Sequence, residues 1–188
     1  MAIKTFTAGS VLTAADTNTY LANAGLVYVT SKTWTSTSSA QQIDNCFTSA
    51  FDNYKIVFEG TSNQSTPIYM GYQLVDGTTP DQNATYYTSN IYATTSATPA
   101  ANWYPAATVG YAGWVGDTVN LITMDVASPA LAKPTIVSGQ TTGFGTVQMI
   151  GGIFHTFKNT TTQYEGIKFS IGSGTWAGTF TVYGYRKG

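Results

Sequence analysis

Apolar and polar side chains alternate along most of the chain that follows residue 25. Tyr54, Ile56 and Phe58 occupy every second position of one such segment. Residues 68–74 alternate in the same way ahead of an Asp-Gly turn signal. A period of two places the apolar side chains on one face of an extended chain, so both segments are predicted to be β-strands.

The same pattern predicts four further strands, at residues 118–126, 145–153, 166–171 and 178–185. Gly, Pro, Ser or Asn bounds each of them. Many short strands with turn residues between them indicate an all-β fold, an antiparallel β-sandwich of jelly-roll-like type, rather than a parallel α/β sheet. Residues 26–188 are predicted to form this domain. Residues 94–105 show neither period and are predicted to be a long loop, the kind of segment that often carries binding residues.

One short helix is predicted ahead of the strands, from about residue 14 to residue 24. Thr13 and Asp16 have the spacing of a capping box, and Gly25 suits the end of a helix. A helix this short with a weak apolar face is marginal alone in water, so we expect it to form against another surface. Residues 1–25 are interpreted as an attachment segment; a plug at one end of the sandwich is the alternative. The side chains expected to make the contact in either case are Leu12, Tyr20 and Leu21.

The composition predicts a polar surface that is almost uncharged. Charged residues make up 9% of the 188 residues, whereas an ordinary soluble domain has about 25%. Copies with a net charge of −1 repel one another only weakly. We therefore expect a homo-oligomer.

Several partners and locations are disfavoured by the sequence. The eight basic residues are scattered, which argues against nucleic acid. No apolar run reaches the roughly 20 residues of a membrane-spanning helix, so membrane insertion is not expected. The N-terminus has no apolar signal region, so we expect the protein to be made in a cytoplasm and not to be exported by the usual route. Cys46 is the single cysteine, so no intrachain disulfide forms and we expect the thiol to be buried.

Catalysis finds little support in the sequence. His155 is the only histidine, and the common nucleophile, zinc, phosphate-loop and calcium motifs do not occur. A Ser-His-Asp triad needs no fixed spacing and stays open. Glycosidases need only two carboxylates, and Glu59, Asp125 and Glu165 lie in or beside predicted strands. We expect no enzyme activity, no cofactor and no metal, and we assign no catalytic residue.

The aromatic content is the compositional excess that bears on function. The chain has 13 Tyr, 9 Phe and 4 Trp. One group of rings lies in and after the predicted loop and comprises Trp103, Tyr104, Tyr111 and Trp114. Two interpretations stay open: the rings fill the core or a subunit interface, or they stack on a sugar.

Three segments of the chain resemble proteins of tailed-bacteriophage particles. Residues 6–21, FTAGSVLTAADTNTYL, resemble the AGxxLTAxDxNxYL start of phage minor tail and fibre-like proteins. Residues 45–57, NCFTSAFDNYKIV, resemble an FDNYxIV segment, and residues 178–186, GTFTVYGYR, resemble a GTxxVYGYR segment of the same proteins. Physically, Asp52 suits a turn before a strand, and Gly184 permits a bulge or the close approach of another backbone, so the latter two segments are interpreted as fold determinants.

The resemblance implies a virion structural protein of the tail, fibre or capsid surface, made in the bacterial host and assembled with other virion proteins. It also implies a homotrimer, the habit of phage fibres, and contact with a host surface glycan. It implies no catalytic residues. The alternative is a soluble carbohydrate-binding, lectin-like module that uses Trp103 and Trp114.

Overall fold

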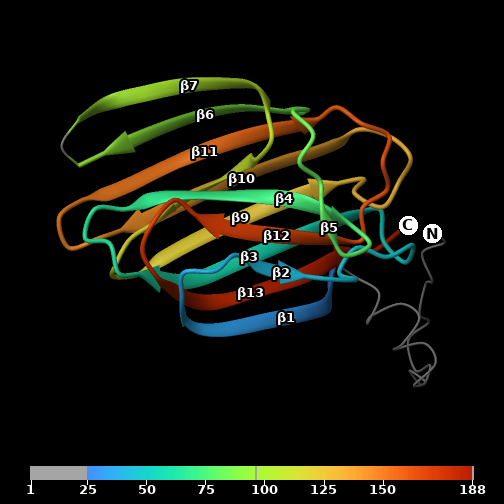
Figure 1. The fold of residues 1–188 in the computed structure, drawn as a ribbon, viewed down its shortest axis with the longest axis horizontal. Helices are drawn as coiled ribbons and strands as arrows, with labels where there is room; N and C mark the ends of the chain where they lie inside the picture. The colour runs from blue at the N-terminus through green and yellow to red at the C-terminus, as the bar shows by residue number, and fades with distance from the viewer. Residues whose placement is uncertain (1–24, 96, 188) are drawn as a thin grey trace, which may run out of the picture.

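Two antiparallel β-sheets pack face to face in the computed structural model, which describes residues 25–95 and 97–187 (Figure 1). The large sheet has eight strands, in the order β1 (Leu26–Thr37), β13 (Trp176–Tyr185), β3 (Asn53–Ser62), β9 (Asn120–Ala127), β10 (Thr135–Phe144), β11 (Met149–Lys158), β6 (Tyr86–Thr94) and β7 (Ala97–Ala107). The small sheet has five strands, β2 (Gln41–Ile43), β12 (Gly166–Ile171), β4 (Ile68–Asp76), β5 (Thr79–Pro80) and β8 (Gly110–Val115), which pairs with β4. The predicted all-β antiparallel sandwich is confirmed.

The predicted N-terminal helix lies outside the described residues. The same holds for Leu12, Tyr20 and Leu21, so the attachment segment and the division of the chain at residue 25 stay predictions. Within the described part of the chain, no helix is long and apolar enough to cross a membrane.

The inward side chains of β3 and β13 explain why these segments form central strands. Tyr54, Ile56 and Phe58 of β3 are fully buried, as the alternation predicted. Phe180 and Val182 of β13 are also fully buried. Burial of each such apolar side chain is worth about 1.5–3 kcal/mol.

Aromatic rings join the two sheets near their common edge. Phe180 of the large sheet stacks on Phe169 of the small sheet, with ring centroids 3.8 Å apart. Trp34 of β1 stacks on the same Phe180 at 5.3 Å and meets Trp176 edge-on at 4.5 Å. These rings account for the core at the β1 end of the sandwich.

Cys46 is fully buried and free. Its thiol donates to the Ile43 carbonyl oxygen at 3.5 Å. Burial raises the pKa of this thiol to about 12. The expected role as a small buried side chain is confirmed.

Two of the segments that resemble phage proteins meet at one end of the sandwich. Tyr54 pairs with Gly184 across β3 and β13, and a Cβ at Gly184 would lie 2.3 Å from the Phe51 ring. The Tyr54 hydroxyl donates to the Thr48 carbonyl oxygen at 2.7 Å. Gly184 is closely approached, but by the side chain of Phe51 and not by another backbone as expected.

The strand predicted at residues 145–153 is wrong in its first half. Gly145 and Gln148 exchange backbone hydrogen bonds of 2.9 and 3.2 Å and close a tight turn, and β11 begins at Met149. Thr146 fixes this turn because its backbone N–H donates to Asp117 Oδ1 at 2.6 Å. β9 likewise begins two residues later than predicted, at Asn120.

The long loop predicted at residues 94–105 is also wrong, because most of it is the strand β7. β7 is the last strand of the large sheet, so its outer edge needs no partner. Pro99 and Pro105 lie at the two points where the register between β6 and β7 shifts. Proline is tolerated at bulges and on edge strands because it has no N–H to donate.

Candidate functional site

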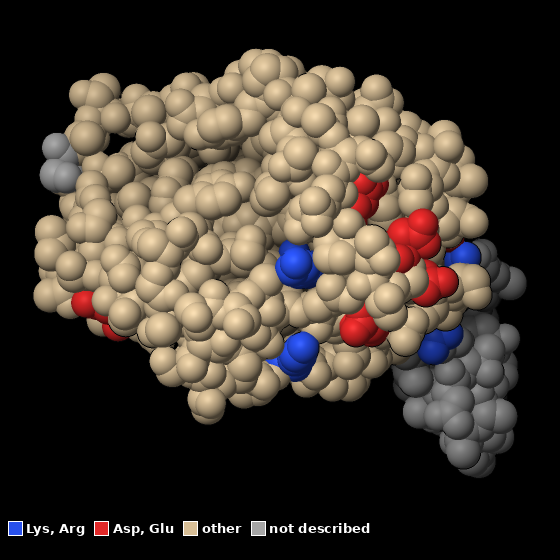
Figure 2. Space-filling model, viewed as in Figure 1, with Lys and Arg blue, Asp and Glu red and all other residues tan. Residues whose placement is uncertain are grey.

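An aromatic groove opens between the β6–β7 hairpin and the small sheet. β8 packs against β10 and β11 of the large sheet, and β6 and β7 extend beyond it. The groove has a volume of about 490 Å³ and no charged side chain in its lining. Figure 2 shows this face hollowed below its upper rim, with most of its charged side chains on the right-hand half. The lining includes Tyr69, Tyr92, Asn102, Tyr104, Tyr111 and Trp114.

The rings of the groove hold one another in place. Trp114 lies 4.5 Å from Tyr92 and 4.9 Å from Tyr111, measured between ring centroids. Tyr69 lies 5.4 Å from Tyr111, and its hydroxyl donates to the Gly110 carbonyl oxygen at 3.2 Å. Such tilted and edge-on contacts are favourable arrangements for aromatic pairs. The wall formed by β4 and β8 is thus preformed.

Two buried polar groups at the groove lack partners within the described part of the chain. Tyr111 is 2% exposed and its hydroxyl makes no hydrogen bond. Asn90 is 3% exposed, and neither its amide nitrogen nor its amide oxygen is paired. Asn90 is the cross-strand partner of Asn102 on one side and of Phe154 on the other, and Phe154 contacts the Tyr111 ring at 5.3 Å. Tyr111 lines the groove, and Asn90 lies on the same face of β6 as the lining residues Thr88 and Tyr92, between them.

Burial raises the pKa of Tyr111 above its ordinary value, and the neighbouring Tyr69, Tyr104 and Tyr92 act in the same direction. The phenol is therefore protonated at all physiological pH values. It is able to donate one hydrogen bond and to accept others.

The four aromatic residues singled out from the sequence are divided between two surfaces. Tyr104, Tyr111 and Trp114 line the groove. Trp103 points to the opposite face of the sheet, where it is 62% exposed and lies 6.4 Å from the Tyr87 ring. The structure does not bring Trp103 and Trp114 to one surface, because Trp103 and its neighbour Tyr104 point to opposite faces of β7 and Tyr104 shares the groove with Trp114.

Trp103 belongs to the apolar half of the outer face of the large sheet, defined here as the outward side chains of β10, β11, β6 and β7. Strand register places them in rows, with Ile136 opposite Phe157, and Ile153 opposite Ile91. The exposed fractions in this half are 40% for Phe157, 49% for Ile153, 52% for Ile136, 55% for Ile91 and 62% for Trp103. Lys158 is the only charged residue in these four strands, and its side chain is fully buried.

The outward side chains of β1, β13 and β3 form the polar half of the same face. Lys55 pairs with Asp125 of β9 at 3.4 Å. Thr33 and Thr179 share a hydrogen bond of 2.8 Å between their hydroxyls. β9 is the boundary, because it carries Asp125 near one end and the exposed Leu121 near the other.

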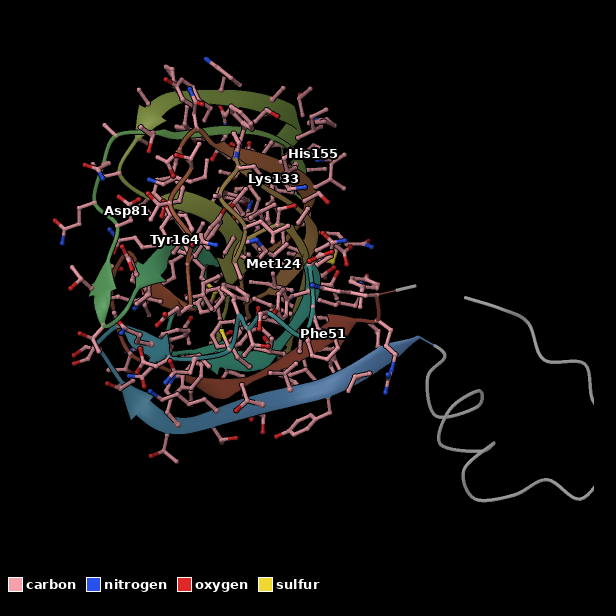
Figure 3. All side chains as sticks on the ribbon, turned by 90° about the vertical axis from the view of Figure 1, so that its right-hand side faces the viewer. Phe51, Asp81, Met124, Lys133, His155 and Tyr164 are labelled. Atoms are coloured by element: carbon pink, nitrogen blue, oxygen red, sulfur yellow. The ribbon has the colours of Figure 1, made fainter. Side chains whose placement is uncertain are left out.

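Lys158 points inward and forms a buried cluster with Asp81 and Tyr164. Its Nζ lies 2.9 Å from Asp81 Oδ2, donates to Thr85 Oγ1 at 2.6 Å, and lies 3.9 Å from the centre of the Tyr86 ring. The Tyr164 hydroxyl donates to the same Asp81 oxygen. Figure 3 labels Asp81 and Tyr164 on the small-sheet side of the molecule. The cluster ties residues 81–85 to the segment before β12.

The charges in this cluster are stabilised by their neighbours. Burial alone would raise the pKa of Asp81, but hydrogen bonds from Tyr164, the Asn83 backbone N–H and Lys158, together with the Lys158 charge, lower it. Burial lowers the pKa of Lys158, and the Asp81 carboxylate offsets part of this effect. Every member has a partner inside the protein, so the cluster has the features of a structural ion pair.

The carboxylates considered for catalysis do not form a pair that resembles a glycosidase site. Glu59 lies opposite Leu121, four residues along β9 from Asp125, and four residues of a strand span about 13 Å. Asp125 is also bonded to Lys55 and to the Tyr185 hydroxyl. Glu165 is exposed beside the small sheet. Within the described ranges, no group of three or more His, Cys, Asp or Glu is placed to hold a metal ion.

His155 lies on the outer face of the large sheet, between Ser138 and Ser89 of the neighbouring strands. In Figure 3 the large sheet extends from β1 at the bottom to β7 at the top, with His155 labelled on its outer side. The expected packed or surface role is consistent with this exposed position.

No protein-family model, no curated protein and no solved structure matches this chain.

Proposed function

We propose that this chain is a structural protein of a tailed-bacteriophage particle, located in the tail, a fibre or the capsid surface. The three segments at residues 6–21, 45–57 and 178–186 support the phage origin. The apolar half of the outer face carries the proposal of assembly, because an interface is expected to present uncharged surface with large apolar and aromatic side chains.

The proposed occupant of the apolar half is a second copy of this chain. Five large apolar side chains between 40% and 62% exposed lie on adjacent strands, and none of the four strands has an exposed charge. A net charge of −1 adds little repulsion between copies. In a cyclic trimer each copy contacts its two neighbours through two different parts of its surface, and a trimer that buries this face is the proposed form.

Light scattering of the purified protein tests the assembly. The unmodified chain is expected as a trimer, and Ile153→Lys as a monomer, because each interface would then bury an unpaired charge. Thr123→Lys is the matched control, since Thr123 lies in the same cross-strand row as Ile153, two strands away. An unmodified protein that is monomeric at micromolar concentration contradicts assembly through this face.

Particle incorporation tests the phage role itself. Labelled antibody against the protein should decorate purified particles of the phage that encodes it. A chain of residues 26–188 should keep its melting transition and lose incorporation if residues 1–25 are the attachment segment. A collapsed transition favours the plug, in which Leu12, Tyr20 and Leu21 complete the sandwich. Unchanged incorporation contradicts attachment by this segment.

A further inference from the structure

We propose that the aromatic groove binds a neutral saccharide. This site is on the opposite side of the β6–β7 hairpin from the apolar half, and it does not depend on the assembly proposed above. Its volume of about 490 Å³ lies within the range of about 300–1,000 Å³ that is usual for small-ligand sites.

The rings give the groove two kinds of wall. Trp114 is half-buried against Tyr92 and Tyr111 and forms a fixed surface. Tyr104 is 44% exposed on the edge strand β7 and faces it from the other side. The C–H faces of a pyranose pack on such rings, while its hydroxyls stay at the rim of the rings and reach polar groups.

The unpaired groups of Tyr111, in the lining, and of Asn90, between two lining residues of β6, select the polar part of the occupant. Asn90 leaves both a donor and an acceptor unpaired, and Tyr111 leaves a hydroxyl unpaired. A sugar hydroxyl both donates and accepts, so it satisfies all three. A proline-rich peptide also packs in aromatic grooves, but its carbonyl groups accept only and its prolines have no N–H.

The lining also selects against charge. No Lys, Arg, Asp or Glu lines the groove, so an acidic sugar would lose its hydration without gaining a counter-charge. An unpaired buried polar group destabilises a fold, so such groups are a reason to look for a ligand that pairs with them. A neutral saccharide satisfies both the apolar and the polar features of the groove.

Calorimetric titration of the full chain tests the proposal. The probes are neutral oligomers of glucose, galactose, mannose and N-acetylglucosamine, with sialyllactose as the charged probe and decaproline as the peptide probe. At least one neutral oligomer should bind at millimolar concentration or below. Sialyllactose and decaproline should bind at least tenfold more weakly.

The variants exploit two adjacent residues of β7 that face opposite sides. Tyr104→Ala should weaken binding of the neutral oligomer about tenfold or more, whereas Trp103→Ala should leave it unchanged. Tyr111→Phe and Asn90→Leu remove the unpaired polar atoms with little change in volume. Each should weaken binding about fivefold to tenfold without lowering the melting temperature, since no internal hydrogen bond is lost.

The variants Tyr111→Phe and Asn90→Leu separate a role in binding from a role in packing. A lower melting temperature for Tyr111→Phe would mean that its hydroxyl serves the fold. The proposal is overturned by that result, by the absence of binding to every neutral oligomer, by binding that survives Tyr104→Ala, or by preferred binding of decaproline.

Discussion

The two halves of the outer face belong to one sheet and differ in what they present to solvent. On β3 the inward Tyr54 and Phe58 are apolar, and the outward Lys55 pairs with Asp125. On β11 both sides carry large apolar side chains, since Phe154 is buried and Ile153 points outward, and the one charged side chain, Lys158, points inward. A sheet face can therefore be apolar without being part of the core.

The difference also concerns the inner side of the sheet. The small sheet covers the inner side of the strands that carry the polar half, where aromatic rings such as Phe169 and Phe180 meet. Beyond β8 the cover ends, and the inner faces of β6 and β7 border the aromatic groove. The β6–β7 hairpin therefore offers two uncharged surfaces, one on each side.

The largest expected effect separates the buried charge of Lys158, on the inner side of β11, from the partly exposed charge of Lys55 in the polar half. Lys158→Met leaves the Asp81 carboxylate buried without its cation, and should lower the free energy of unfolding by about 3–5 kcal/mol. Lys55→Met removes an exposed ion pair and should cost about 1 kcal/mol or less. Urea unfolding measures both, and equal losses would contradict the assignment of Lys158 to the core.

A smaller effect is expected on acidification. The pKa of Asp81 is lower in the folded protein than the value of about 3.9 in an unfolded chain. Its contribution to stability is therefore complete above about pH 4 and is lost as the pH falls through the lower, folded value. The urea concentration at the midpoint of unfolding, measured from neutral to acidic pH, should decrease within that pH window. Asp81→Asn should be less stable at neutral pH and should flatten the fall, whereas an equally steep fall would show that other carboxylates cause it.

Converting the apolar half toward the composition of the polar half should change association more than folding. Ile136→Thr combined with Ile153→Thr should weaken self-association about 30-fold, as expected for a loss of about 2 kcal/mol at an interface. The melting temperature of the dissociated chain should change by only a few degrees, because both side chains are about half exposed. Sedimentation at several concentrations gives the association constant. A stability loss with unchanged association would assign the two residues to the fold alone.

The smallest effect belongs to the hydroxyl pair of the polar half. Thr179→Val removes the 2.8 Å hydrogen bond with Thr33 but keeps a β-branched side chain. The expected loss is about 0.5 kcal/mol or less, since both hydroxyls are open to water. A loss above 1 kcal/mol in thermal unfolding would show that the polar half is held by specific pairs rather than by the core beneath it.

Sequence alternation predicted β3 and β13 of the polar half but not β10, β6 and β7 of the apolar half, for a physical reason. In β3 the alternating apolar side chains Tyr54, Ile56 and Phe58 are the ones that point inward, so the sequence pattern identifies the buried face. In β10 the inward positions include the buried Thr135 and Thr141, while Ile136 points outward. The segment Thr135–Phe144 therefore shows no clear alternation and was not predicted as a strand. In β7 the two prolines suggested a loop, although an edge position makes them compatible with a strand.

The groove could be predicted only in part. Tyr104, Tyr111 and Trp114 were singled out because they are close in sequence, and they do share the groove. Trp103 does not line the groove, and without a strand assignment the direction of its side chain had no sequence signal. Tyr69 and Tyr92 were missed because strand pairing, rather than sequence proximity, brings them there. The unpaired state of Asn90 follows from packing and has no sequence signal.

Because the thiol of Cys46 is buried, the surface of this protein is unreactive toward thiol reagents. Cys46 is the single cysteine of the chain, and its pKa of about 12 leaves almost no thiolate at neutral pH. A cysteine introduced on either side of the β6–β7 hairpin would therefore be the one reactive thiol. A fluorophore or cross-linker attached there would report on a single surface, without first removing a native residue from the core.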